Sequence, residues 1–239
     1  MAPTAGICVV MPEDGNQQDL DDFTPAGFSL DFQLTPVPPG EATVSMLWRM
    51  AEDREIEDAA LLGARQQPAC ISYACTAASF VRGKGGDEDI NRRITAATGI
   101  PATSTSTSLL RALRALNVER LAVATPYLDE LNERLDLFLE AHGFRVVSML
   151  GLNAKVIQDV TPQEIVQLAR DCDSADAEAV FVSCTTMKTA PYVAELEETL
   201  QKPVLSANQV SIWDAVQLTG IQPAMPARGR LFELEASPK

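Results

Sequence analysis

The chain has 239 residues, of which 46% are hydrophobic, and its 33 acidic and 19 basic side chains give a formal net charge of −14. This excess of negative charge disfavours binding along a phosphate backbone, so we expect no nucleic-acid partner. The sequence contains no apolar run of about 18 residues, the length that a membrane span needs, and we expect no membrane partner. Residues 1–7 lack the basic flank and apolar stretch of a secretion signal, which predicts a cytoplasmic protein.

The five cysteines are scattered and odd in number, and the chain has a single histidine. This pattern is typical of free thiols in a reducing compartment and not of a disulfide framework. With one histidine and no CxxC pair, the sequence predicts no zinc site and no other bound metal.

Strands and helices alternate through the first half, judged from apolar runs, helical spacing and Gly/Pro punctuation. A polar loop, 12–22, leaves the carboxyl end of the first strand. The expected elements, in chain order, are a strand over 7–11, an extended segment near 32–34, one or two helices within 42–65, a strand ending before Cys75, helical segments after Cys75 and over 87–98, a strand opened by Pro101, and a helix with the apolar stripe of 109–116.

The second half repeats the alternation. Thr125 and Pro126 look like the N-cap and first residue of a helix, and Thr161 opens a capping box with Glu164. The expected elements are a strand over 121–124, a helix from Pro126 to Gly143, a strand over 144–148, a helix from 161, a strand ending before Cys184, a strand opened by Pro203, and a last helix over 211–218.

This alternation predicts an α/β fold of two pseudo-symmetric Rossmann-like lobes with parallel sheets and an active-site cleft between them. We expect residues 1–117 and 211–239 to form the first lobe and residues 118–210 the second.

Two segments of the chain are alike: 69–76 (Ala-Cys-Ile-Ser-Tyr-Ala-Cys-Thr) and 179–186 (Ala-Val-Phe-Val-Ser-Cys-Thr-Thr). Each is a buried strand that stops at a Cys-Thr pair, and each is followed by a strand that a proline opens, 26 residues after Cys75 and 19 after Cys184. Because parallel strands place reactive groups at their carboxyl ends, we expect the two thiols to face one another across the cleft. The helix expected after each cysteine would stabilise a thiolate, so that one thiol attacks or takes a proton while the other gives one.

Several further polar side chains are candidates for binding substrate. Thr76 and Thr185 would offer hydroxyl and N–H donors to a carboxylate or enolate, with helix capping as the alternative role. Ser104 and Asn208 follow the two proline-opened strands at the predicted cleft edges, where a polar turn explains Ser104 equally well.

Four segments together resemble the aspartate/glutamate racemase superfamily, and within it the branch of maleate isomerases and arylmalonate decarboxylases: 73–76, 124–134, 182–185 and 206–213. The resemblance implies two Rossmann-like lobes around a site that needs neither cofactor nor metal. In maleate isomerases the first cysteine adds to the double bond and the second acts as an acid, roles that fall to Cys75 and Cys184. Tyr127 matches a tyrosine that the family directs at a substrate carboxylate. The loop 13–16 departs from the Ser-Asn-Thr pattern of maleate isomerases, and Asn16 is the candidate for that contact.

The preferred function is that of a cofactor-independent isomerase acting on a small carboxylate, with maleate to fumarate as the specific reaction. The resemblance also allows decarboxylation of an arylmalonate with Cys184 as proton donor, or racemisation of an amino-acid derivative. Decarboxylases usually carry glycine where this chain has Cys75, which favours isomerase or racemase chemistry. A non-enzymatic sensor of dicarboxylates is the remaining alternative. The sequence leaves open whether the chain forms a homo-oligomer.

Overall fold

Two parallel sheets form the framework of the protein in a computed structural model that describes residues 5–223 and 228–234. The first sheet has the strand order β2-β1-β3-β4 and the second the order β6-β5-β7-β8, so the two halves share one topology. The strands of the first sheet are β1 (Ala5–Pro12), β2 (Phe28–Thr35), β3 (Cys70–Tyr73) and β4 (Ala102–Ser104). Those of the second are β5 (Arg120–Thr125), β6 (Arg145–Gly151), β7 (Ala179–Val182) and β8 (Val204–Ser206). The expected parallel α/β fold is confirmed.

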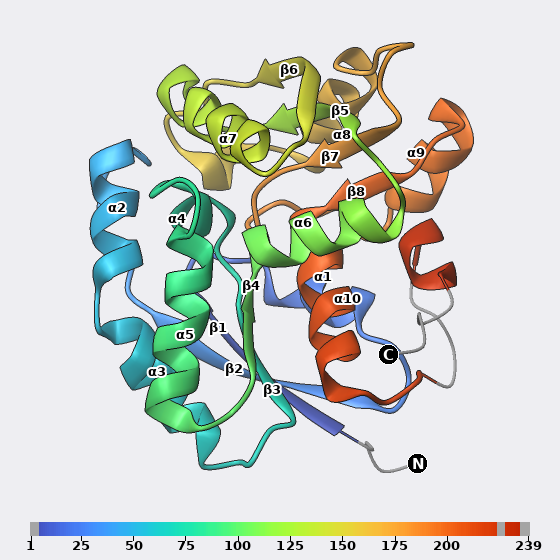
Figure 1. The fold of residues 1–239 in the computed structure, drawn as a ribbon. Helices are drawn as coiled ribbons and strands as arrows, with labels where there is room; N and C mark the ends of the chain where they lie inside the picture. The colour runs from blue at the N-terminus through green and yellow to red at the C-terminus, as the bar shows by residue number, and fades with distance from the viewer. Residues whose placement is uncertain (1–4, 224–227, 235–239) are drawn as a thin grey trace.

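Helices connect the strands and cover both sheets (Figure 1). They are α1 (Gln17–Phe23), α2 (Val44–Glu52), α3 (Glu55–Ala64), α4 (Thr76–Phe80), α5 (Gly86–Thr98), α6 (Thr105–Ala115), α7 (Asp129–Ala141), α8 (Pro162–Asp171), α9 (Val193–Leu200) and α10 (Ala207–Thr219), with short 3-10 turns η1 (Ile157–Asp159) and η2 (Arg230–Glu233). Within the described residues, no helix is long and apolar enough to cross a bilayer.

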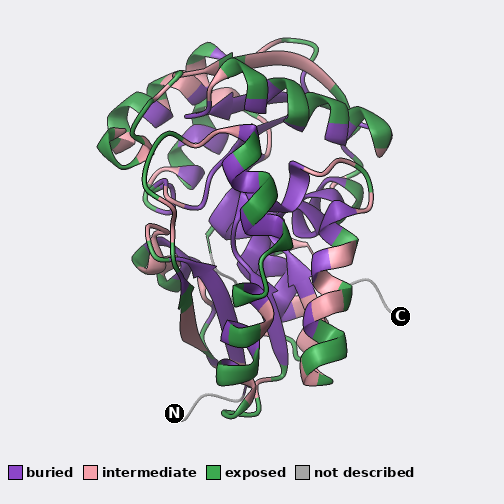
Figure 2. Ribbon diagram, turned by 90° about the vertical axis from the view of Figure 1, so that its left-hand side faces the viewer, coloured by how far each residue is buried: buried purple, intermediate pink, exposed green. Residues whose placement is uncertain are grey.

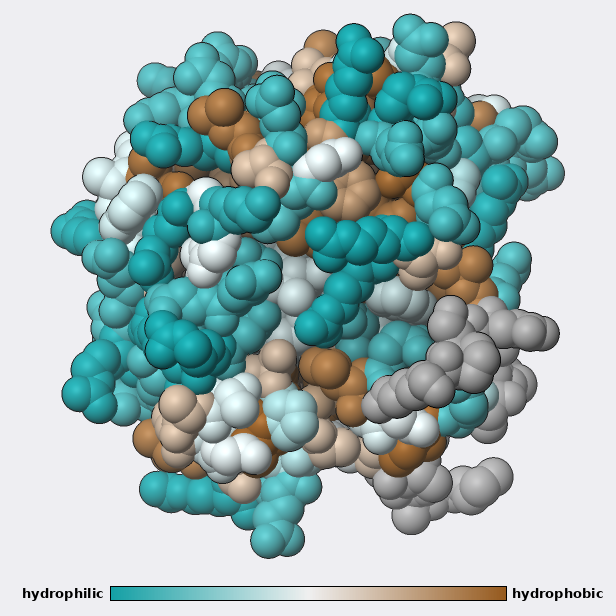
Figure 3. Space-filling view, viewed as in Figure 1, coloured by the Kyte–Doolittle hydropathy of each residue, from teal (hydrophilic) through white to brown (hydrophobic). Residues whose placement is uncertain are grey.

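The central strands of each sheet are buried on both faces, as their continuous apolar runs require. Figure 2 shows this core as purple strands beneath helices whose outer faces are exposed. Helix α3 lies against β1 and β2 at a close approach, because Gly63 lacks a side chain and a Cβ there would overlap the sulfur of Cys8. The outer surface in Figure 3 is mainly hydrophilic, with small hydrophobic patches between the polar side chains.

The two halves meet through helices and aromatic rings. Helix α10 follows the last strand of the second sheet but packs against α6 and β3 of the first half. At the junction of α4 with α7, the ring of Phe80 lies 6.1 Å from that of Tyr127 and 6.4 Å from that of Phe138. The division into residues 1–117 plus 211–239 and 118–210 remains our proposal. The turn η2 contacts the second half, since the Arg230 N–H donates to Glu197 of α9.

One expected helix start is wrong. Helix α7 begins at Asp129, and Thr125 is the last residue of β5 instead of an N-cap. The Thr125 hydroxyl donates to Asn132 at 2.6 Å and accepts the Tyr127 N–H at 3.2 Å. These bonds hold residues 126–128 as a turn at the sheet edge, which delays the helix by one turn.

Candidate active site

Cys75 and Cys184 occupy corresponding places in the two sheets. Cys75 lies two residues beyond the end of β3, and Cys184 lies two residues beyond the end of β7. Both side chains are 7% exposed, and both line the same cavity. The sequence repeat thus corresponds to two thiols at one site between the halves.

This cavity, which we call the two-thiol cavity, has a volume of about 60 Å³. Its lining combines polar residues that follow strand ends with apolar side chains from the 37–50 region and η1. Its lining comprises Pro12, Asp14, Val37, Ala42, Met46, Leu47, Met50, Cys75, Thr76, Ala77, Tyr127, Ile157, Cys184, Thr185 and Thr186. Among the described residues, no lysine or arginine lines it.

Burial holds the Cys75 thiol in its protonated form. Burial raises its pKa from 9.0 to about 12, and the negative charges of Asp14 and Cys184 act in the same direction. The Ala78 N–H and the Tyr73 phenol donate hydrogen bonds that lower the pKa, but burial outweighs them. The helix that the sequence predicted after Cys75 is present as α4, with Cys75 as its N-cap and Thr76 as its first residue.

Cys184 has a different local setting. Its backbone has φ of +90°, a conformation that a residue with a side chain rarely adopts. No helix follows it directly, since the next one is α9, so the expected helix N-terminus at this thiol is wrong. Burial raises the pKa of Cys184, while hydrogen bonds from Thr186 and from the Tyr127 phenol lower it.

Tyr127 lines the cavity and is 2% exposed. The Ser183 hydroxyl donates to its phenol oxygen at 3.3 Å, and the phenol itself donates toward the Cys184 sulfur, which lowers the pKa of that thiol. Burial raises the pKa of Tyr127, and the phenol therefore stays a donor throughout the neutral range.

The two threonines that follow the cysteines also line the cavity. The buried hydroxyl of Thr76 has no hydrogen-bond partner among the described residues. The Thr185 hydroxyl donates to the Ala74 carbonyl at 3.2 Å, and this bond links the two cysteine segments directly. Thr76 is thus the freer donor for a ligand.

Three of the residues named from the sequence lie outside the cavity lining. The Asn16 side chain caps α1 by accepting the Asp19 N–H at 3.0 Å. Ser104 is buried beside Thr107, with their hydroxyls 3.1 Å apart. The Asn208 amide donates to Asp19, to the Thr185 carbonyl and to the Met187 carbonyl. The structure therefore gives these three side chains contacts within the protein.

Sequence reasoning missed Asp14 as a lining residue. It belongs to the loop after β1 that was expected to leave the sheet edge, but the spacing did not tell it apart from its neighbours. Its carboxylate accepts from Gln158 at 2.6 Å, and burial raises its pKa. Asp14 adds negative charge to a cavity without a cation, which disfavours ionisation of both thiols.

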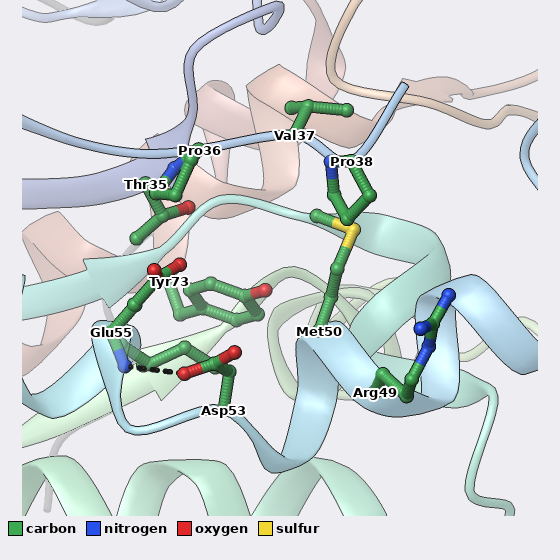
Figure 4. A pocket seen from close by; sticks show the side chains of 10 residues that line it. Thr35, Pro36, Val37, Pro38, Arg49, Met50, Asp53, Glu55 and Tyr73 are labelled. Carbon is green, nitrogen blue, oxygen red and sulfur yellow. Dashed lines mark hydrogen bonds between the residues drawn. The ribbon is translucent and has the colours of Figure 1, made fainter. Parts of the chain in front are cut away.

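A second cavity of about 260 Å³ adjoins the two-thiol cavity and shares Val37 and Met50 with it. Figure 4 shows the Tyr73 ring projecting into it toward Met50, with Asp53 and Arg49 at other sides. Tyr73 is 1% exposed and interacts with Cys75 through its phenol. Tyr73 is therefore another residue next to the Cys75 thiol, and the sequence did not identify it as a site residue.

Comparison with known proteins gives consistent matches. A family model described as arylmalonate decarboxylase matches residues 48–232. The chain is 36% identical to an arylmalonate decarboxylase of Bordetella bronchiseptica over 176 residues, 71% of this chain and 73% of that protein. It is 29% identical to a maleate isomerase of Nocardia farcinica over 192 residues, 77% of this chain and 74% of that protein.

Solved structures agree with these sequence matches. A doubly substituted arylmalonate decarboxylase in a liganded form superimposes with a TM-score of 0.84 at 29% identity, covering 96% of this chain and 99% of that one. The similarity therefore extends over both halves and includes the segments that carry the two thiols.

Proposed function

Because the chain belongs to the arylmalonate decarboxylase family and is an enzyme of that decarboxylase and isomerase group, we propose that it isomerises a small carboxylic acid with two thiols, most specifically maleate to fumarate. The observation that carries this proposal is that Cys75 and Cys184 line one cavity of about 60 Å³. Pockets for drug-sized ligands measure roughly 300–1,000 Å³, so the volume favours a substrate of only a few heavy atoms.

Two thiols that line one cavity support the following reaction. The Cys75 thiolate adds to one alkene carbon, and Cys184 gives its proton to the other, which leaves a C–C single bond that rotates. The Cys184 thiolate then takes a proton back from that carbon as the C–S bond breaks. Cys75 leaves as thiolate, and the double bond re-forms in the trans geometry. Atoms and charge balance without a cofactor.

Charge developing on the substrate carboxylate needs donors, since no cation lines the described cavity. Thr76 has a hydroxyl without a hydrogen-bond partner among the described residues, and Tyr127 has a phenol that donates toward the Cys184 sulfur. Thr185 and Thr186, which follow Cys184 in the chain, also line the cavity. Fixed donors in a buried site stabilise an enolate-like state more strongly than water does. We assign substrate binding to these residues, and we retain Asn16, Ser104 and Asn208 as weaker candidates.

Decarboxylation of an arylmalonate is the second candidate. The family match and the apolar wall of Val37, Met46, Leu47 and Ile157 favour it, because such a wall suits an apolar substituent. In that reaction CO₂ leaves, the donors hold the resulting enediolate, and Cys184 protonates its carbon. Cys75 has no required step.

Cysteine variants separate the two candidates. We expect Cys75→Ala and Cys184→Ala each to abolish conversion of maleate to fumarate, measured by proton NMR from the separate vinyl signals of the two acids. Cys8→Ala is the matched control, because Cys8 is a buried thiol of β1 that lies outside the cavity. Full turnover of maleate by Cys75→Ala would overturn the isomerase proposal. Turnover of an arylmalonate that requires Cys184 but survives Cys75→Ala would establish the decarboxylase instead.

A further inference from the structure

The segment 184–190, which we call the Cys184 loop, is fastened by a buried carboxylate from the first half of the chain. Asp19 of α1 is 0% exposed. Its Oδ1 accepts the backbone N–H groups of Thr189 at 2.8 Å and of Ala190 at 2.7 Å. Its Oδ2 accepts the Thr189 hydroxyl at 2.8 Å and the Asn208 amide at 2.8 Å. One side chain therefore fixes the far end of the loop.

Asn208 fixes the near end. Besides its bond to Asp19, its Nδ2 donates to the carbonyls of Thr185 and Met187, both at 3.2 Å. The Thr185 carbonyl also accepts the Asn16 N–H at 3.0 Å. Asp19 and Asn208 thus form one hydrogen-bonded unit, here called the clamp, whose bonds reach from Thr185 to Ala190.

The clamp holds a conformation that the loop would not adopt alone. Cys184 has φ of +90°, which disfavours every residue that has a Cβ. Such conformations persist where the surroundings over-determine them, and they gather at functional sites. The Thr185 hydroxyl also donates to Ala74, the residue before Cys75, so the clamped loop is held in register with the first thiol.

A corresponding contact exists in the other half. Ser106, the second residue after β4, donates its hydroxyl to the Thr76 carbonyl at 3.3 Å. Asn208, the second residue after β8, donates to the Thr185 carbonyl. Each half therefore tethers the threonine that follows its cysteine, and the Cys184 loop is also held by the buried carboxylate of Asp19.

We propose that Asp19 and Asn208 are positioning residues that set the Cys184 sulfur relative to Cys75, a role that rests on the proposed two-thiol function. Asp19 accepts four donors, which only a carboxylate can do with its two oxygens. The two N–H groups of the Asn208 amide lie within hydrogen-bonding distance of three acceptors, so a donor amide is required there. An aspartate at 208 would set a carboxylate against two carbonyls and Asp19.

The test uses the variant Asp19→Asn. If that variant does not fold, Thr189→Val is the milder substitution, because it removes only one of the donors to Asp19. Asp21→Asn is the matched control, since Asp21 is an exposed carboxyl of the same helix. Loosening the loop should lower kcat for maleate by about 100-fold with little change in KM, because a small displacement disrupts the reacting geometry. Iodoacetamide labelling of Cys184, read by peptide mass spectrometry, should become about tenfold faster as the thiol gains solvent contact.

Labelling of the other thiols separates positioning from general damage. Cys75 and the core thiols Cys8 and Cys172 should keep their wild-type labelling rates in Asp19→Asn. Ser106→Ala should show the reverse pattern, with only Cys75 labelled faster. Equal acceleration at every cysteine, or no change at Cys184, would overturn the proposal. Because labelling needs no turnover, this result is obtained even if maleate is not the substrate.

Discussion

Cys75 and Cys184 are alike in sequence and unlike in their surroundings. Cys75 has extended backbone, caps a short helix and receives the Tyr73 phenol. Cys184 has φ of +90°, lies in a loop and receives Thr186 and Tyr127. Burial raises the pKa of both thiols, so each must lose its proton to a base or to bulk solvent before it can attack.

The pH dependence of Cys75 follows from its raised pKa. With a pKa of about 12, the thiol is almost fully protonated at neutral pH, and its thiolate fraction grows tenfold per pH unit. Labelling by iodoacetamide, measured by peptide mass spectrometry, should keep rising from about pH 7 to about pH 10, whereas a free cysteine levels off above its pKa of about 8.5. A plateau at Cys75 within that range would contradict the assignment.

Tyr127 should contribute through its hydroxyl and not through its ring. Tyr127→Phe keeps the contact with Phe80 and removes one donor from the cavity. We expect kcat to fall about 100-fold, the usual effect of losing one donor to a developing negative charge. The melting temperature should change little. Tyr192→Phe is the control, because Tyr192 lies outside this cavity, and equal losses in both variants would argue against a role for Tyr127.

At the scale of elements, the sequence predicted a helix start correctly where a few adjacent residues determine it. The capping box of Thr161 and Glu164 is present as predicted, because its bonds join residues three apart. The similar signal at Thr125 failed because Asn132 and the Tyr127 N–H bind the threonine hydroxyl in a turn. A distant partner on α7 therefore decided where that helix begins.

The two capping boxes should differ in their effect on activity. Ser206 caps α10 and precedes the clamp residue Asn208, while Thr161 caps α8 at the surface. Ser206→Ala and Thr161→Ala should each lower the free energy of unfolding by about 1 kcal/mol, measured by urea denaturation. Only Ser206→Ala should also reduce turnover. Unchanged turnover in both variants would show that the N-cap of α10 has no effect on activity.

At the scale of the whole molecule, the common strand order β2-β1-β3-β4 and β6-β5-β7-β8 brings two strand ends to one cavity. Cys75 and Cys184 follow the corresponding strands β3 and β7. Ser106 and Asn208, which follow β4 and β8, donate hydrogen bonds to the carbonyls of the threonines next to the thiols. The family resemblance and the repeat had predicted this pairing. The closing apolar wall from α2 was not predicted, since its residues carry no chemical signal in the sequence.

The buried thiols should make the folded state sensitive to alkaline pH. Burial raises the pKa of Cys8, Cys70, Cys75 and Cys172 from 9.0 to about 12. In the unfolded chain these thiols ionise near pH 9, while in the folded protein they stay protonated. The folded state therefore binds more protons, and the free energy of unfolding should fall as pH rises from about 9 to about 12.

Urea denaturation at stepped pH measures this fall. The double variant Cys8→Ala, Cys172→Ala removes two of these thiols away from the two-thiol cavity and should show a shallower decline. A wild-type stability that stays constant through about pH 11 would mean that the thiols ionise with similar pKa in both states.

The sequence by itself determined the parallel α/β fold, the repeated strand-Cys-Thr unit and the two thiols, because apolar runs and a repeated motif are local patterns. Only the tertiary structure decided which polar groups share the cavity. Asp14 lines the cavity, and Asn208 belongs to the clamp, because contacts between α1, the Cys184 loop and α10 join residues up to 189 positions apart. Spacing along a chain does not encode such contacts, whereas packing of the two halves does.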